Sequence, residues 1–309
     1  MDTNLTQSNI EKLVIKKNYS HSFILTKIFR RLPMMGWIGS NFNKYRSKKI
    51  QEQLTPLFEY TLSSFREEKK SAKNQYLNNT IWFFWWQGED KLTPLSSKCY
   101  ASIIRNKGHR KVVLISKKNI SEYIKLPKYI YYKLENQQIS VTHFSDIVRF
   151  GLLEKYGGLW VDATIYVTDN LDKFKTDKFI FCSGYPVDRH FNVALGRWTS
   201  FFIGGPPKSK IFKFMKEFYL VYWKNNNQII DYFMLDYALN FGFDHNLSEF
   251  QSLSQKYENI APNMFKLQPL LNKTFDEKVW EKIQKDNSIF KLSNRKKIKL
   301  NKKSFYSVL

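Results

Sequence analysis

The sequence predicts an α/β protein with a mostly parallel central sheet. Three short apolar runs, at 81–86, 111–116 and 159–162, have the length and composition of buried strands. Helix-forming segments at 95–106 and 145–156 lie between them. Strands that alternate with helices at this spacing predict an α/β sandwich.

The first 75 residues differ from the rest of the chain. Between Lys12 and Lys49 there are ten Lys or Arg residues and no Asp or Glu, interleaved with bulky apolar side chains. This pattern is typical of a helix lying on an anionic membrane surface, but a helical extension packed on the rest of the protein has the same composition. Pro33 and Gly36 should divide the segment into two helices. A further helix is expected at 50–73.

We therefore expect a basic helical N-terminal extension at 1–75 and one α/β domain at 76–309. In the second part, 119–124 and 127–134 are expected to be short helices, and 139–142 a short strand or a lead-in. The helix at 145–156 should begin at Ser145 as N-cap and end at Gly157 as C-cap. The remaining elements are a strand at 179–183, a loop at 204–207 and helices at 208–225 and 228–241.

Charge and cysteine content limit the function classes. The formal net charge of +23 implies an anionic partner, which includes nucleic acid, an anionic membrane or a phosphorylated substrate. The two cysteines, Cys99 and Cys182, are too few for a disulfide scaffold and are expected to be buried free thiols. With no signal peptide and no apolar run of about 20 residues, we expect a cytoplasmic protein that is soluble or peripheral on the inner membrane face.

Asp146 and Arg149 are the first candidates for chemistry. They lie three residues apart on a predicted helix and so share one face. Asp146 falls in the expected first turn, where the helix dipole favours a carboxylate. From spacing alone, a structural ion pair or a capping group is the favoured explanation.

Asp162 is placed differently, at the end of a predicted strand. Open α/β sheets bind ligands outside the carboxyl ends of their strands. One or two carboxylates together with phosphate oxygens hold Mg²⁺ in nucleotide sites. Thr164 should project to the same side if the strand continues, since side chains alternate. The alternative is an ordinary turn residue at a strand end.

Taken together, these motifs resemble a known family. Ser-Asp-Ile-Val-Arg at 145–149, followed by Tyr-Gly-Gly-Leu-Trp-Val-Asp at 156–162, resembles the central signature of glycosyltransferase family thirty-two. More narrowly, the chain is similar to the bacterial capsular polysaccharide synthesis branch. Ile-Trp-Phe-Phe-Trp-Trp-Gln-Gly at 81–88 is similar to the first strand of that family. The resemblance is good over 78–175, and weaker at 231–236 and at Lys-Leu-Ser, 291–293.

The resemblance implies a GT-A (Rossmann-like) fold, a nucleotide-diphosphate sugar donor, Mn²⁺ or Mg²⁺, and transfer with retention of configuration. It implies that Trp85 lines the nucleotide base, and that Asp146 and Arg149 hold sugar and ribose hydroxyls. Asp162 would ligate the metal. The donor-binding set implied by the matched motifs also includes four smaller residues: Gly88, Ser145, Gly157 and Gly158.

One departure from the family pattern concerns the metal. The usual motif is Asp-x-Asp, whereas this chain has Asp162, Ala163 and Thr164. Asp162 and Thr164 are therefore the expected metal-contacting pair, with one carboxylate fewer than usual. Weaker metal binding or additional ligands would follow. The candidates for additional ligands are Asp236, His245 and Ser293, each of which has an ordinary structural explanation.

The predicted function is transfer of a hexose or N-acetylhexosamine, with UDP-linked donors as the default, to a saccharide or lipid-linked saccharide acceptor of a capsular or surface polysaccharide. Two other classes compete with it. A catalytically inactive scaffold for polysaccharide assembly would explain Thr164. A basic nucleic-acid-binding protein would explain the charge, but no nucleic-acid-binding motif is visible, so no nucleic acid partner is expected.

Overall fold

The structure, a computed structural model, describes residues 13–17, 19–32, 36–64, 79–184, 193–256, 260–299 and 302–309. Within these residues the chain forms a five-stranded sheet of order β2-β1-β3-β6-β5. The strands are β1 (Thr80–Phe84), β2 (Lys111–Ile115), β3 (Gly158–Val161), β5 (Ile180–Phe181) and β6 (Phe202–Gly205).

The sheet is mostly parallel, as predicted. β1 runs parallel to both β2 and β3, whereas β6 is antiparallel to β3 and to β5. Four of the five strands therefore run in one direction. A separate two-stranded antiparallel sheet joins β4 (Ile165–Val167) to β7 (Ile289–Lys291).

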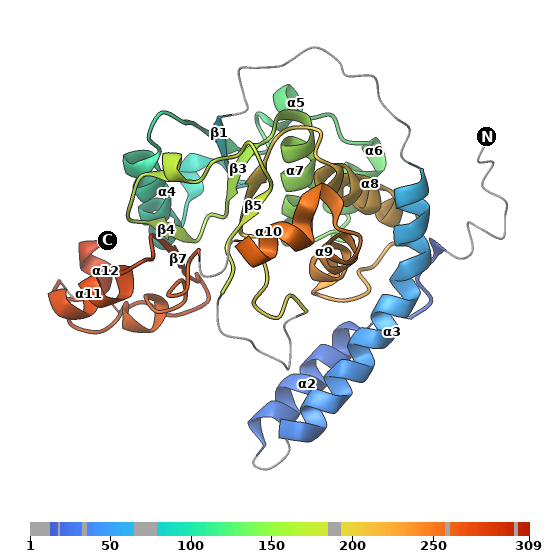
Figure 1. Ribbon diagram of the computed structural model, residues 1–309, viewed down its shortest axis with the longest axis horizontal. Helices are drawn as coiled ribbons and strands as arrows, with labels where there is room; N and C mark the ends of the chain where they lie inside the picture. Colours follow the sequence, from blue (N-terminus) through green and yellow to red (C-terminus); the bar gives the residue numbers. More distant parts are fainter. Residues whose placement is uncertain are drawn as a thin grey trace.

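Helices cover both faces of the sheet (Figure 1). The helices are α2 (Ser20–Arg31), α3 (Gly36–Ser63), α4 (Pro94–Asn106), α5 (Ile120–Tyr123), α6 (Lys128–Glu135), α7 (Val141–Tyr156), α8 (Lys210–Asn225), α9 (Met234–Asp244), α10 (Phe250–Lys256), α11 (Glu277–Gln284) and α12 (Phe305–Val308). The expected helices at 95–106, 119–124, 127–134 and 208–225 are confirmed.

The alternation of side chains along the strands divides the core into two parts. Trp82 and Phe84 of β1 belong to the core part that includes α7 and α8. Ile81 and Phe83 belong to the part that includes Ile103 of α4. The two cysteines, Cys99 and Cys182, are buried free thiols as expected, and burial raises the pKa of Cys99 to about 12.

The start of the helix that carries Asp146 was predicted wrongly. α7 begins at Val141, and its N-cap is Ser140, whose hydroxyl accepts from the backbone N–H of His143 at 3.2 Å. Residues 139–142 therefore lead into the helix and form its first residues, so the strand alternative there is wrong as well. Ser145 lies inside the helix and donates to the carbonyl of Thr142 at 2.6 Å. Gly157 ends α7 as expected, with φ of 66°.

Two further expectations are corrected. Gly204 and Gly205 belong to β6 and not to a loop, because both pair with β3. The two strands lie so close that a Cβ on Gly204 would be 2.5 Å from the carbonyl oxygen of Gly158. The last predicted helix begins at Met234 instead of 228. Before it, the carboxylate of Asp231 accepts from the backbone N–H of Phe233 at 2.9 Å, which forms a local turn in place of a helix.

The N-terminal segment forms two helices, α2 and α3, separated near Pro33 and Gly36 as predicted. They form a hairpin that projects from the body of the protein (Figure 1). The C-terminal half of α3 packs into the main core through Ile50, Leu54, Leu57 and Phe58. The expected domain boundary near residue 75 lies outside the described residues. The separate helix expected at 50–73 is corrected: residues 50–63 continue α3, which ends at Ser63, and positions 65–73 lie outside the described residues. None of the described helices has the length and apolarity needed to cross a membrane.

Candidate active site

The turn between α7 and β3 brings the predicted motifs together. Gly157 and Gly158 have backbone φ angles of 66° and 92°, which residues with a side chain rarely adopt. A Cβ on Gly158 would be 2.4 Å from the carbonyl oxygen of Thr80 in β1, and one on Gly157 would be 2.6 Å from the backbone of Pro207. The protein's own backbone therefore requires both glycines. As a result, β3 runs directly beside β1, with Asp162 at its carboxyl end.

Arg149 lies between the two predicted carboxylates. Its guanidinium donates to Asp146 at 2.6 Å and to Asp162 at 3.1 Å. The guanidinium carbon is 4.8 Å from the centre of the Trp160 ring, a cation–π distance. Only 3% of Arg149 is exposed. Asp146, Arg149 and Asp162 thus form one connected group, which the sequence spacing predicted only for the first two.

Asp146 is the buried end of this group. Burial raises the pKa of its carboxyl, and Arg149 and His143 offset part of that effect. The hydroxyl of Tyr219, on α8, donates to its second oxygen at 3.4 Å. Asp146 and Arg149 do not line either cavity described below, so their direct role toward a donor stays a prediction.

Asp162 is the accessible end of the group. Its Oδ1 accepts from Trp160 Nε1 at 2.8 Å and from Arg149, and its Oδ2 accepts from Lys291 Nζ at 3.2 Å. Burial alone would raise the pKa of this carboxyl, but Lys291 and Arg149 outweigh it and hold the pKa below its usual value. Asp162 is therefore a charged carboxylate whose two oxygens are both occupied by N–H donors.

Thr164 faces the same side as Asp162, although the reason differs from the expected one. The strand does not continue: the N–H of Ile165 donates to the carbonyl of Asp162 at 3.0 Å, which closes a turn over 162–165. Lys291 Nζ donates to Thr164 Oγ1 at 2.6 Å and so contacts both members of the expected metal pair. Sequence reasoning assigned no role to Lys291. The only signal was its place in the weakly matching stretch at 291–293.

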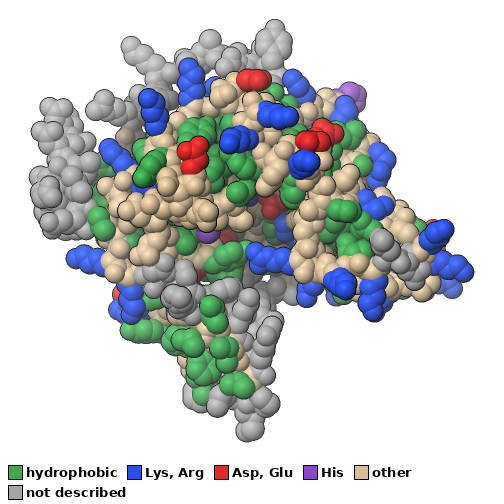
Figure 2. Space-filling view, turned by 180° about the vertical axis from the view of Figure 1, so that it is seen from behind, with side chains coloured by type: hydrophobic (Ala, Val, Ile, Leu, Met, Phe, Trp, Pro, Cys, Tyr) green, Lys and Arg blue, Asp and Glu red, His purple; other side chains and the backbone are tan. Residues whose placement is uncertain are grey.

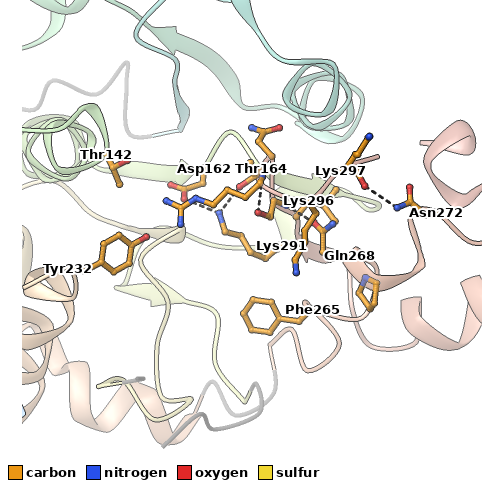
Figure 3. A pocket seen from close by; sticks show the side chains of 15 residues that line it. Thr142, Asp162, Thr164, Tyr232, Phe265, Gln268, Asn272, Lys291, Lys296 and Lys297 are labelled. Carbon is orange, nitrogen blue, oxygen red and sulfur yellow. Dashed lines mark hydrogen bonds and ion pairs between the residues drawn. The ribbon is translucent and has the colours of Figure 1, made fainter. Parts of the chain in front are cut away.

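Two cavities meet at Asp162 and Thr164. The large cavity, of about 910 Å³, is lined by residues of the C-terminal segment, which include Ser293. Lys291 also lines it (Figure 3). Its lining residues include four cationic side chains and one acidic one: Lys291, Arg295, Lys296, Lys297 and Asp162. The strand-end cavity, of about 340 Å³, lies where β1 and β3 end and is lined by Trp85, Trp86, Ser145, Trp160 and Ala163 in addition to the shared residues.

The remaining predicted residues lie elsewhere. Gly88 has φ of 94° and follows Trp85 in the turn after β1, but it lines neither cavity. Asp236 accepts from Trp198 Nε1 at 3.2 Å, and burial raises the pKa of its carboxyl to about 6. His245 Nδ1 lies 2.9 Å from the carbonyl of Phe241. Of the three additional ligand candidates, only Ser293 lines the large cavity.

These residues do not fit a divalent cation well. In the part of the chain that the structure describes, no three His, Cys, Asp or Glu side chains are grouped as a metal would require. A cation placed between Asp162 and Thr164 would meet the ammonium group of Lys291. The expectation of Mn²⁺ or Mg²⁺ stays a prediction, and this arrangement does not favour it.

Fold and site together define a class: an α/β protein with a cation-rich cavity beside the carboxyl ends of parallel strands. The chain belongs to the capsular polysaccharide synthesis protein family, because the model of that family matches residues 37–309. The match includes nearly all of α3 and the whole of the candidate site. No curated protein matches the chain in a sequence comparison.

Proposed function

We propose that this protein is a GT-A-type glycosyltransferase of capsule synthesis, which moves a sugar from a nucleotide-diphosphate donor to a growing, lipid-linked polysaccharide. The observation that carries the proposal is the pair of adjoining cavities at Asp162. They lie outside the carboxyl ends of β1 and β3, where open α/β sheets bind ligands. The membership in a capsule-synthesis family supports the same conclusion.

The lining of the cavities fits the parts of such a donor. Trp85 and Trp86 line the strand-end cavity and offer aromatic surface for a nucleotide base. The cations of the large cavity offer charge for a diphosphate. In the transfer that we propose, the bond from the anomeric carbon to a phosphate oxygen breaks, and nearby cations stabilise the charge that develops on that oxygen. Transfer with retention of configuration remains part of the proposal.

The experiment that tests this function is a donor panel. UDP-, GDP-, dTDP- and CDP-linked hexoses and N-acetylhexosamines are added singly, with Mn²⁺ or with EDTA. We expect at least one donor to raise the melting temperature, because a ligand that binds only the native state stabilises it. We also expect slow hydrolysis of that donor, in which its sugar passes to water and the nucleoside diphosphate is released. If several donors bind and none is hydrolysed or transferred, the protein is a scaffold. If nucleic acid alone stabilises it, it is a nucleic-acid-binding protein.

A membrane surface is the second partner we propose. Ile24, Leu25, Ile28 and Leu32 on α2 are between 42% and 55% exposed. They recur at the helical spacing that places them on one side of α2, and Figure 2 shows hydrophobic side chains gathered on the projecting hairpin. The sequence of α2 adds Lys27, Arg30 and Arg31 and no acid. Apolar and basic residues on one helix suit an anionic lipid surface, where a lipid-linked acceptor would be found.

Replacing two of these side chains should weaken lipid binding. In Ile24→Asn/Ile28→Asn, we expect affinity for vesicles that contain phosphatidylglycerol to fall by about tenfold or more, because two exposed aliphatic side chains that would insert into the lipid are lost. Flotation measures the bound fraction. The matched control is Ile104→Asn/Val308→Asn, which removes two exposed aliphatic side chains from α4 and α12. Equal flotation of both variants would reject the proposed surface.

A further inference from the structure

The main chain determines where Lys291 stands. β7 pairs with β4 so that Lys291 lies opposite Ile165, directly after the 162–165 turn. The N–H of Leu292 donates to the carbonyl of Thr164 at 2.8 Å, and the N–H of Lys291 donates to Met264 at 2.7 Å. These backbone bonds hold the start of the Lys291 side chain beside Thr164, independently of any contact made by its ammonium group.

The ammonium group of Lys291 lies between the two side chains expected to contact a metal. It donates to Asp162 Oδ2 at 3.2 Å and to Thr164 Oγ1 at 2.6 Å, and it lies 5.0 Å from the centre of the Phe201 ring. A lysine ammonium has three N–H donors, so one remains for another acceptor. Because 23% of the side chain is exposed and it lines the large cavity, a ligand there can reach that donor (Figure 3).

The chemistry of Thr164 explains why a lysine can occupy this place. A second carboxylate at position 164 would favour a divalent cation, whereas a hydroxyl is neutral and binds such a cation weakly. Asp162 pairs with two cationic groups, the guanidinium of Arg149 and the ammonium of Lys291, without a metal ion. The hydroxyl of Thr164 completes the contacts of the lysine.

Three more cations follow Lys291 on the same wall of the large cavity. Arg295, Lys296 and Lys297 all line it, and all three are exposed. Their loop is held in place: the amide of Asn272 donates to the carbonyl of Lys297 at 3.0 Å, and its oxygen accepts from the N–H of Lys299 at 2.8 Å. A diphosphate in this cavity would meet several positive charges without any metal ion.

We propose that Lys291, held between Asp162 and Thr164 and supported by the cations at 295–297, neutralises the donor diphosphate in place of a divalent cation. This inference rests on the proposed glycosyltransferase function. When the bond between the anomeric carbon and the phosphate oxygen breaks, the electron pair stays on the diphosphate, beside Lys291. The acceptor hydroxyl bonds to the anomeric carbon, and its proton passes to the released diphosphate or to water. The protein then binds and turns over its donor without metal.

The first measurement needs no variant. Binding of UDP, GDP, ADP, CDP and dTDP to the full chain is measured by calorimetry in EDTA and again in Mn²⁺. We expect the preferred nucleoside diphosphate to bind in EDTA, with a dissociation constant within about threefold of that in Mn²⁺, since the protein already supplies the cationic charge.

Variants of Lys291 then identify the source of that charge. In Lys291→Met, the dissociation constant in EDTA should rise by about tenfold or more, because a charge-assisted hydrogen bond to phosphate is lost. Lys291→Arg keeps the positive charge and should lose much less affinity. Lys278→Met is the matched control: it removes an exposed lysine from α11, outside the large cavity, and should leave binding unchanged. Thermal melting confirms that each variant is folded.

The outcomes separate the two proposals. If no nucleoside diphosphate binds in either buffer, the glycosyltransferase function fails and this inference fails with it. If binding and turnover occur only with Mn²⁺ or Mg²⁺, the function stands and the role of Lys291 is overturned. Wild-type affinity of Lys291→Met in EDTA overturns it as well, even when binding is independent of metal.

Discussion

Asp162→Asn should lower the rate of donor hydrolysis by a factor of about 10² to 10³, the loss typical when one preorganised electrostatic group is removed from an active site. Asp162 is the only acidic side chain among the described residues that line the two cavities. Its charge holds Arg149 on one side and Lys291 on the other. The amide keeps the size of the side chain but loses the charge that pairs with Lys291 and Arg149.

The matched control for this variant is Asp169→Asn. Asp169 is a surface carboxylate paired with Lys173, and it lines neither cavity. Release of nucleoside diphosphate from the preferred donor gives the rate, and thermal melting confirms that both variants are folded. If Asp162→Asn kept the wild-type rate, the assignment of this site would be wrong. A loss of rate together with an equal loss in Asp169→Asn would point to a nonspecific effect of charge.

Arg46→Met should destabilise the whole fold by about 3–5 kcal/mol, the cost of leaving a buried charge without its partner. Arg46, on α3, is 1% exposed and forms an ion pair with Asp231, whose exposure is 0%. Burial already raises the pKa of Asp231, and Arg46 offsets part of that effect. Without the guanidinium, Asp231 must either remain buried as an unpaired charge or take up a proton. Denaturant unfolding measures the free energy lost.

Two comparisons make this prediction specific. Arg46→Met/Asp231→Asn removes both charges and should recover much of the lost stability, because no unpaired buried charge remains. Lys49→Met, on the same helix, breaks only the exposed pair with Glu52 and should be nearly neutral. If Arg46→Met were as stable as Lys49→Met, α3 would not be part of the cooperative unit.

Local patterns in the sequence were sufficient for most elements. The apolar runs at 81–86 and 111–116 become β1 and β2 because a short apolar segment between turns is buried wherever the sheet forms. The helix that carries Asp146 and Arg149 was found, but its start was misplaced by several residues. Ser145 was expected to be the N-cap, and the structure shows that Ser140 makes the cap instead.

The glycines show a different limit. The resemblance placed Gly157 and Gly158 in the donor-binding set. In the structure, the neighbours that exclude a Cβ at these positions are the protein's own backbone atoms, at Thr80 and Pro207. A motif identifies a position where a side chain does not fit. It does not identify which atoms occupy the space.

By itself, the sequence determined the α/β class, the mostly parallel sheet, and the placement of Asp162 at a strand end, because these depend on periodicity and turns within short windows. Only the tertiary structure decided what surrounds Asp162. Lys291 reaches Thr164 from 127 residues away along the chain, through the pairing of β4 with β7. Arg46 likewise contacts Asp231 across a long stretch of sequence. It lies on α3, which composition alone could not assign to the main core or to a membrane surface. Contacts of this kind depend on how distant segments pack together, and no local pattern of residue types records that packing.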